Sequence, residues 1–469
     1  MCSSSGKREL FFFFPSLVAD CGSPALNSNM EDDRLSDLPP NIVESILTRL
    51  PIREAVKTSI LSRSWRYKWA SLTKLVFDDN CVDSLGDFTK DIFVNFVTRC
   101  LFLHQGPIHM FKLSTSYLQY VPDIDQWILF LSRNDIKELV LELGEGEWFR
   151  VPSCLFNCSK LTRLELVNCE LDPPPTFKGF PNLRILTLHQ VLVAADAIES
   201  LISSCPVLEN LSLSYFDSLA MTISAPNLKY LNLEGEFKDI CLENTPALVA
   251  LSVAMYMTDD IAEHFEQSSS CKFVKFLGGT PLLEHLIGQI YFTKYLSIGD
   301  YPATFSITYD RLKVIELYQV SFEDMKEILV VLRLITSSPN LRELTISVSF
   351  DGTLYNVIER SLFYDFLSLL QGSSNTVASA VVTTDLDFWE EECPSDCTFG
   401  QLKSVKMTDL SCVPHELEFI KFILRNSPIL ETMRVSPSSY VKDKTVNMLM
   451  QLVRFRRASA QAELIFEHE

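Results

Sequence analysis

A short hydrophobic pattern recurs along most of the chain. Leucine or a similar apolar residue occupies the first, fourth and sixth positions of a six-residue segment, and polar residues fill most other positions. Ten copies begin at residues 136, 161, 183, 208, 228, 248, 312, 341, 402 and 430, and LLEHLI at 282 is a degenerate candidate. From 136 to 248, successive copies start 20 to 25 residues apart. This period is typical of leucine-rich repeats, in which stacking buries leucines that one repeat cannot bury alone.

Proline stands two residues before the opening leucine in seven places: Pro181, Pro206, Pro226, Pro246, Pro281, Pro339 and Pro428. Proline lacks a backbone donor and disfavours helix in the residue before it, so it fits the step into a new strand. Cys169 occupies the position where such repeats commonly have asparagine or cysteine. One isolated copy could equally be an amphipathic helix, but ten copies with this proline offset favour a curved solenoid. Glu165, Ser212 and Asn232 are expected on its concave face.

Residues 33–79 follow a different, helical pattern. Ile42, Val43, Ile46, Leu47 and Leu50 are spaced for one helix face, and Pro51 ends that helix. A second short helix is expected through Ala55 and Val56, and a third carries Trp65 and Trp69 on one face. A segment this short has a marginal core of its own. Part of its apolar surface is therefore expected to be covered by something else.

The charge of this helical segment differs from that of the whole chain. Between Arg49 and Lys74 there are seven basic residues and one acidic residue, Glu54, whereas the 469-residue chain carries −19. A basic patch beside exposed apolar residues favours an acidic protein partner. The alternative is a small helical cap on the next domain, with the basic side chains merely solvated.

Three pieces of this segment, DLPPNIVESIL, LPIREAVKTSILS and SRSWRYKWASL, resemble in sequence and order the plant form of the F-box. The resemblance implies that the segment docks a Skp-type adaptor and, through it, a cullin scaffold. Trp69 is expected to hold the segment together internally. The implied adaptor contacts are Leu38, Pro39, Ile42, Ile46, Leu50, Pro51, Ala55, Val56, Ser59, Leu61 and Trp65.

The C-terminal part has a resemblance of its own. Residues 388–435 are similar to the FBD domain that closes many plant F-box/leucine-rich-repeat proteins, and we expect a terminal cap of the solenoid there. A helical insertion is expected over 257–277, and a long hairpin or flexible link over 349–400. The expected fold class is α/β, and its parts are a disordered extension (1–32), an F-box (33–79), leucine-rich repeats (80–375) and an FBD-like domain (376–469).

Several kinds of chemistry lack their sequence signals. The chain has no G-x-x-x-x-G-K-[ST] phosphate loop, no C-x-x-C pair, no apolar run of membrane-spanning length and no overall basic charge for nucleic acid. Cys393, Cys397, Cys412 and His415 have a spacing that a zinc site could use, but their loop context predicts no metal, and no cofactor is expected.

The 13 scattered cysteines favour reduced thiols in cytoplasm or nucleus. Residues 10–19 resemble a signal peptide only weakly, and a disordered tail or a natural start at Met30 are the alternatives.

The sequence therefore predicts a non-catalytic subunit of a Skp–cullin–F-box ubiquitin ligase that recruits a protein substrate through its repeats. The alternative is a leucine-rich-repeat scaffold that docks the adaptor without supporting ubiquitination. No catalytic cluster supports an enzymatic reading. The pattern names no substrate.

Overall fold

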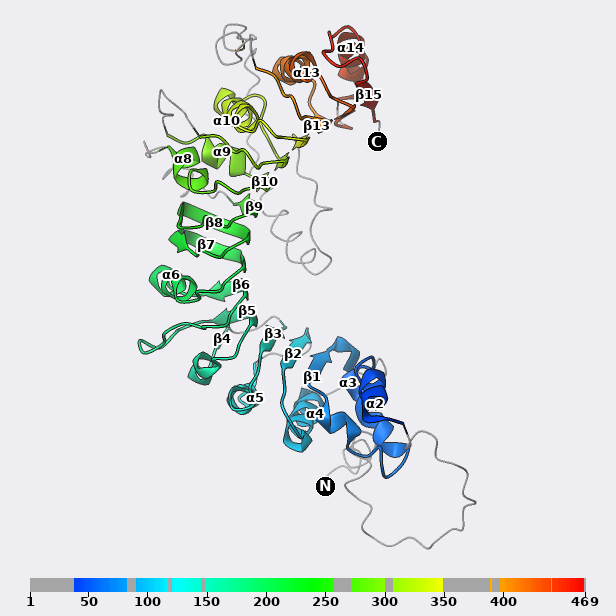
Figure 1. Ribbon diagram of the computed structural model, residues 1–469, viewed down its shortest axis with the longest axis vertical. Helices are drawn as coiled ribbons and strands as arrows, with labels where there is room; N and C mark the ends of the chain where they lie inside the picture. Colours follow the sequence, from blue (N-terminus) through cyan, green and yellow to red (C-terminus); the bar gives the residue numbers. More distant parts are fainter. Residues whose placement is uncertain are drawn as a thin grey trace, which may run out of the picture. The chain divides into compact units, whose positions relative to one another are not determined.

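The computed structural model describes residues 38–81, 90–116, 118, 120–144, 148–256, 271–299, 307–348, 389, 397–439 and 441–467. The chain divides into two compact units, Met1–Tyr215 and Phe216–Glu469. Figure 1 shows the same kind of layering in each unit, with strands stacked in sequence order and helices or loops returning beside them.

The first unit is built on parallel strands. They follow the order β1-β2-β3-β5-β6-β7, and the short β4 pairs with the end of β5. β7 runs on into the second unit. The bounds are β1 (Lys74–Asp78), β2 (Met110–Thr115), β3 (Glu138–Leu143), β4 (Phe149–Arg150), β5 (Arg163–Glu170), β6 (Ile185–Leu192) and β7 (Asn210–Ser224).

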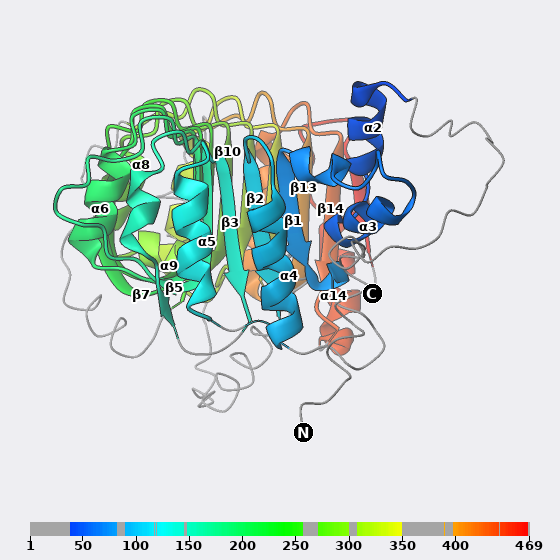
Figure 2. The ribbon, with the colours of Figure 1, turned by 90° about the horizontal axis from the view of Figure 1, so that it is seen from below.

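Helices of the first unit fall into two groups. The N-terminal helical module (residues 38–72) contains α2 (Pro40–Leu47), α3 (Ile52–Lys57) and the 3-10 turns η2 (Thr58–Ile60) and η3 (Lys68–Ser71). The return segments contain α4 (Lys90–Leu103), α5 (Asp123–Ser132), α6 (Ala195–Ser203), η4 (Asp79–Cys81) and η5 (Ser153–Asn157). Figure 2 shows α4 and α5 lying across one face of β1, β2 and β3.

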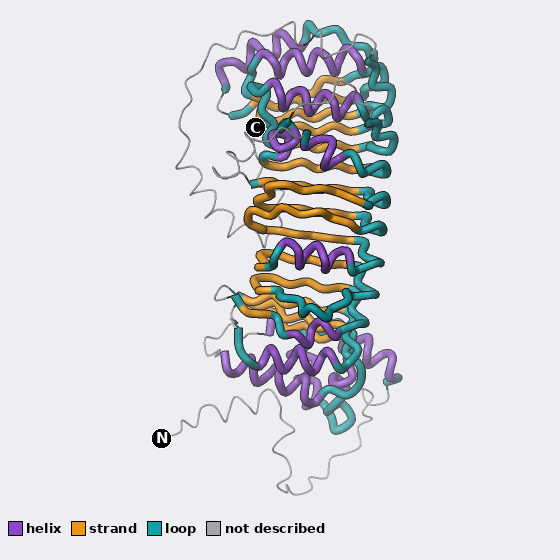
Figure 3. Tube along the Cα trace, turned by 90° about the vertical axis from the view of Figure 1, so that its left-hand side faces the viewer, coloured by secondary structure: helices purple, strands orange, loops and turns teal. Residues whose placement is uncertain are grey.

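The second unit continues the same arrangement in the order β8 to β15, with parallel pairing throughout the described ladder. Its strands are β8 (Tyr230–Glu243), β9 (Ala250–Met255), β10 (His285–Ile290), β11 (Val314–Tyr318), β12 (Glu343–Ser347), β13 (Ser404–Leu410), β14 (Thr432–Pro437) and β15 (Glu463–Phe466). Its helices are α8 (Lys272–Leu277), α9 (Phe292–Leu296), α10 (Met325–Thr336), α13 (Pro414–Asn426) and α14 (Lys442–Leu452). Figure 3 distinguishes these strands and helices by colour.

The recurrent leucines form the core, as predicted. Each of the ten copies coincides with one strand, and the second and third apolar positions of neighbouring copies face each other across the ladder. Leu164, Leu186 and Leu211 form one such row and are almost fully buried. The predicted solenoid, with the helical module before it and the C-terminal repeats closing it, is confirmed.

The degenerate copy at 282 also forms a strand, but its register starts one residue later than expected. Leu283 and Leu286 are buried, and Gly288 takes the place of the third apolar residue. A Cβ atom at Gly288 would lie 2.3 Å from the ring of Phe292, so this ring fills the space that a leucine occupies elsewhere. The pattern was degenerate because the next helix supplies the missing apolar group.

Four strands were not predicted, among them the two-residue β4 (Phe149–Arg150). β1 and β2 follow the repeat pattern with isoleucine or phenylalanine at some apolar positions, and they pair Leu75 with Phe111 and Phe77 with Leu113. β15 has Gln461 where the opening leucine would stand, although Leu464 pairs with Met433. β1 lies inside the segment 33–79, so the sheet begins within the segment that the sequence assigned to the helical module.

The seven prolines have a common structural role. Each is the second residue of a tight turn, and the opening leucine donates its backbone N–H to the residue before the proline, as in Leu208 N to Cys205 O at 3.2 Å and Leu228 N to Ala225 O at 3.1 Å. Proline favours this second turn position because its fixed φ matches the turn and its missing N–H is not needed there. The prolines therefore mark the step into seven of the strands, as predicted.

A left-handed residue recurs within or just after the strands, and its residue type varies from copy to copy. Asn168, Gln190 and Tyr215 have φ values of 56°, 51° and 59°, each two residues after the third apolar position of its copy. Gln319 and Asp409 occupy the same position in the second unit, at 61° and 58°. Asp409 lies where the register of β13 and β14 shifts, between Met407 and Leu410, as at a β-bulge.

Buried glutamates hold two of these loops in the second unit. Glu416, in the first turn of α13, is 1% exposed and accepts hydrogen bonds from the backbone N–H groups of Ser411 (3.0 Å) and Val413 (3.1 Å). Glu327 plays the same part in α10, with Thr293 Oγ1 at 2.6 Å and Ser321 N at 3.3 Å. Each carboxylate thereby satisfies donors that the loop and helix start leave open.

Burial gives Glu416 a stability effect that depends on pH. Loss of hydration raises the pKa of the Glu416 carboxyl to about 7, although the backbone hydrogen-bond donors lower it. The negative charge of Glu323 also raises this pKa. Because the folded state then binds the proton more tightly than the unfolded state, the free energy of unfolding falls as pH rises from about 4.5 to 7. In wild type, this fall in the free energy of unfolding should be on the order of 2 to 3 kcal/mol, and it should be absent in Glu416→Gln. Denaturant unfolding at pH 5 and pH 8 tests this, with Glu418→Gln on the same helix as control; an equal slope in wild type and Glu416→Gln would contradict it.

Some expectations lie outside the described residues. These are the extension 1–32, most of the helical insertion expected over 257–277, most of the hairpin or link expected over 349–400, and Cys393. The end of the insertion is described, and there α8 buries Phe273 and Phe276.

Candidate functional site

The N-terminal helical module has a core of its own. α2 buries Val43 and Leu47, and α3 turns Ile52 inward. Trp65 and Trp69 are 2% and 1% exposed. Trp69 therefore has the internal role that the sequence predicted.

The module is joined to the first repeats of its own unit. Gln105 donates its backbone N–H to the carbonyl of Ala70 at 2.7 Å, and a ring nitrogen of His104 lies 2.8 Å from the carbonyl of Leu72. α3 also packs against β1. The module therefore sits on the first repeat as a fixed element, and its remaining surface faces outward.

Large apolar side chains cover that outward surface. On α2, Ile42 is 43% exposed and Ile46 is 39% exposed, and Leu50 follows at the end of the helix. Leu61 is exposed further along, as are Pro39 and Pro51 at the starts of the two helices. We call this surface the exposed apolar face; its members are Pro39, Ile42, Ile46, Leu50, Pro51, Ile60, Leu61 and Tyr67. So many exposed apolar side chains in one short module favour an interaction site.

Two members of this face were not predicted. Ile60 is 67% exposed and Tyr67 is 47% exposed, and both lie in the turns after α3. Their sequence context gave a usable signal, since an apolar residue in a short polar turn has no core partner nearby.

Three predicted contact residues are corrected by the structure. Ala55, Val56 and Trp65 are at most 2% exposed, so their side chains belong to the core of the module. Apolar residues at helical spacing look alike whether they pack inward or meet a partner. Leu38 and Ser59 are half-buried, and the hydroxyl of Ser59 donates to the carbonyl of Arg66 at 2.8 Å.

The basic residues of the module do not all reach solvent. Arg53 is buried, and Lys57 pairs with Glu54 at 2.8 Å. Lys68 lies over the ring of Trp65, 5.7 Å from its centre. Arg49, Arg63 and Lys74 are exposed. The basic patch beside the exposed apolar face is thus smaller than the residue count suggests.

The open face of the sheet carries the other predicted residues. Glu165 and Ser212 lie in one row with Thr187 across β5, β6 and β7, and all three are half-buried. In the second unit, Asn232 pairs with Ser252. These short polar side chains form a surface that a protein segment could contact, but none of them stands out as an anchor.

Five of the ten described cysteines are buried. All ten described cysteines are free thiols, and burial raises the pKa of Cys158 and of Cys169 to about 12. Such thiols are poor nucleophiles at neutral pH. No described helix is long and apolar enough to cross a bilayer.

The candidate zinc ligands do not converge where they are described. Within the described residues, no group of three or more His, Cys, Asp and Glu side chains could hold a metal. Trp389 donates its indole N–H to His415 Nδ1 at 3.1 Å, and Cys412 Sγ lies 3.3 Å from Met448 Sδ. These contacts give both residues a packing role.

We predict that the purified protein contains no stoichiometric zinc. Elemental analysis of the full chain measures this directly. One zinc per chain that disappears in Cys412→Ser would contradict the prediction.

Comparison with known proteins identifies each part of this architecture. Residues 35–77 match the F-box domain, residues 124–346 match the LRR repeats of the FBD-associated F-box protein At5g56370, and residues 390–435 match the FBD domain. The F-box/FBD/LRR-repeat protein At1g13570 of Arabidopsis thaliana is 56% identical over 442 residues, which cover 92% of this chain and 98% of that protein. The Arabidopsis F-box/FBD/LRR-repeat protein At3g26920 is 26% identical, with 95% and 98% covered. The chain therefore belongs to the plant F-box/FBD/LRR-repeat protein family.

Proposed function

We propose that this protein is the substrate-recruiting subunit of a Skp–cullin–F-box ubiquitin ligase. The exposed apolar face of the F-box is the observation that carries the proposal. Six of its side chains are large and apolar and at least 37% exposed: Ile42, Ile46, Leu50, Ile60, Leu61 and Tyr67. Leaving so much apolar surface in water is unfavourable for a module of this size, and docking to an adaptor removes it from water.

The repeats supply the second half of the function. Their open sheet face and the loops at its edge offer a surface for a protein substrate, while the F-box holds the chain to the adaptor and the cullin. Catalysis then requires only proximity, because a lysine of a bound substrate meets the transfer enzyme at high effective concentration. The chain itself is non-catalytic, and the site of action is the cytoplasm, the nucleus or both.

Reconstitution tests this function. The full chain, a plant Skp-type adaptor and a cullin are mixed and separated by size-exclusion chromatography. A complex of all three that requires the adaptor is the expected result, and failure of the chain to migrate with the adaptor would overturn the proposal.

The alternative is a repeat scaffold that docks the adaptor without supporting ubiquitin transfer. It predicts the same complex, so turnover of the bound protein separates the two. Proteins captured by the chain should accumulate under proteasome inhibition if it is a ligase subunit, and should not respond if it is a scaffold.

A further inference from the structure

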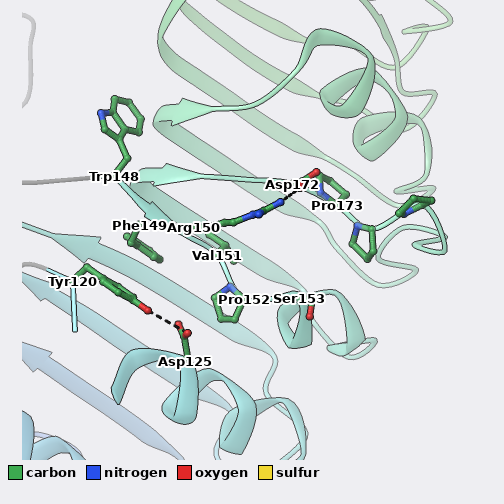
Figure 4. Close-up of a pocket in the computed structure, with 12 residues that line it drawn as sticks. Tyr120, Asp125, Trp148, Phe149, Arg150, Val151, Pro152, Ser153, Asp172 and Pro173 are labelled. Carbon is green, nitrogen blue, oxygen red and sulfur yellow. Dashed lines mark hydrogen bonds and ion pairs between the residues drawn. The ribbon is translucent and has the colours of Figure 1, made fainter. Parts of the chain in front are cut away.

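A groove opens on the first unit where the chain leaves the ends of β2, β3 and β5. Its volume is about 1070 Å³. Its lining comes from the loop before α5 and the first turn of α5, from β4 with the residues on either side of it, and from the loop after β5. Figure 4 shows Tyr120 and Asp125 at one end and Arg150 with Asp172 at the other. These elements are far apart in sequence but belong to successive repeats, so the stacking of the repeats creates the groove.

Aromatic rings line one end of the groove. Tyr120 and Phe149 are stacked, with ring centres 5.9 Å apart and planes within 5° of parallel. Phe149 is buried, whereas Tyr120 is 36% exposed and Trp148 is 41% exposed. An aromatic face carries a negative quadrupole and attracts cations.

A carboxylate lies beside these rings with unused acceptor capacity. One oxygen of Asp125, Oδ2, accepts from the Tyr120 hydroxyl at 3.2 Å. The other, Oδ1, is enclosed and has no hydrogen-bond partner among the described residues. A carboxylate can accept about four hydrogen bonds, and a buried acceptor without a donor costs free energy. Because Oδ1 is closed to solvent, a ligand in the groove would meet Asp125 at Oδ2, beside the Tyr120 hydroxyl.

The charges of the lining favour a positive ligand. Arg150 forms an ion pair with Asp172, so its charge is already matched within the groove. Asp125 has no cation paired with it among the residues that line the groove. The chain outside residues 49–74 carries −25, because the whole chain carries −19 and that segment +6. Such a field attracts basic partners.

We propose that this groove binds a lysine or arginine side chain of the protein substrate, with its cation between the Asp125 carboxylate and the exposed aromatic rings. This inference rests on the proposed function, because it names the substrate feature that the repeats recognise. The groove is larger than one side chain, and Pro173, Pro174 and Pro175 line its other end. Residues that flank the basic side chain can therefore lie along the groove in an extended conformation.

Peptide pools with one fixed central residue test the inference. The flanking positions are mixtures of glycine, alanine and serine, and the central residue is lysine, arginine, leucine, glutamate or proline. Binding to the full chain is measured by fluorescence anisotropy. The lysine and arginine pools should bind about tenfold more tightly than the leucine pool, as one cation–π contact and one charge-assisted hydrogen bond allow.

Asp125→Asn should abolish this preference, because it removes the charge and keeps the size of the side chain. Asp196→Asn is the matched control, since Asp196 also lies in the first turn of a return helix, α6, and outside the groove. The control should keep the preference. Circular dichroism of both variants checks that the repeats stay folded.

Four results would overturn the inference: tightest binding of the glutamate pool, tightest binding of the proline pool, equal or undetectable binding of all pools, or a lysine preference that survives Asp125→Asn. Adaptor binding is measured on the same samples and should be unaffected by Asp125→Asn. A chain that prefers lysine but binds no adaptor would refute the proposed function and leave the groove assignment intact.

Discussion

The double variant Ile42→Ala with Ile46→Ala is expected to lose Skp-type adaptor binding by about a thousandfold while keeping its fold. Interface anchors cost about 2 kcal/mol each when truncated, and each 1.4 kcal/mol is about tenfold in affinity. Both side chains point away from the core of the module, and Val43 and Leu47 hold the other side of α2. Surface changes of this kind usually alter stability by about 0.5 kcal/mol or less.

Isothermal titration of the full chain with the adaptor measures the loss, and circular dichroism with thermal unfolding measures the fold. Val446→Ala with Met450→Ala is the matched control. These two residues are each 59% exposed and lie four apart on α14, at the other end of the chain. The control should bind the adaptor normally. Normal binding by the Ile42 and Ile46 variant would refute the assignment of the exposed apolar face.

Trp65→Ala should unfold the F-box. Removing a fully buried tryptophan costs about 3 to 5 kcal/mol, because the apolar group is lost and a cavity remains. Trp65 is 2% exposed, and Lys68 lies over its ring. A small module has little stability to lose. Limited proteolysis should therefore cut Trp65→Ala within residues 38–72, and adaptor binding should disappear together with the fold.

Two further variants make the Trp65 test specific. Trp65→Phe keeps most of the buried volume and should resist proteolysis better than Trp65→Ala. Tyr67→Ala removes an exposed ring from the same turn and should leave the module folded. If Trp65→Ala resists protease like wild type and loses only adaptor binding, then Trp65 contacts the adaptor directly and is not required for the core of the module.

The repeat architecture could be predicted because its signal is redundant. Each strand needs the same buried leucines, and each turn before a strand favours proline at one position, so ten imperfect copies support one another. The prediction fails for single copies in which another group takes the place of the leucine. Gly288 gives up its side chain to the ring of Phe292, and Gln461 opens the last copy, where the sheet ends.

The surface of the F-box could be predicted only in part. Helical spacing separates the two faces of α2, but it does not tell which face meets its own core, because Val43 and Ile42 are equally apolar. Ala55, Val56 and Trp65 were assigned to the partner by the resemblance to the F-box, and the structure places them in the core of the module. Which side chains are exposed depends on how α2, α3 and the turns around Trp69 pack together, and only the structure shows this packing.

The groove could not be predicted at all. Tyr120, Asp125, Phe149 and Asp172 have no common sequence motif, and three segments that are separate in the sequence bring them together. Loops diverge from the repeat pattern because their side chains are not required for the shared core. The stacking of Tyr120 on Phe149 and the orphaned oxygen of Asp125 are visible only when the repeats are assembled.

Turnover of captured proteins is the most direct test of the central claim. Plant cells express either the wild-type chain or the Ile42→Ala, Ile46→Ala variant, and the half-life of each protein bound by both forms is measured with and without proteasome inhibition. The proposed function predicts at least one bound protein that is short-lived with wild type, and long-lived with the variant or under inhibition. Equal half-lives of all bound proteins in the two lines would contradict a role in substrate recruitment for ubiquitination.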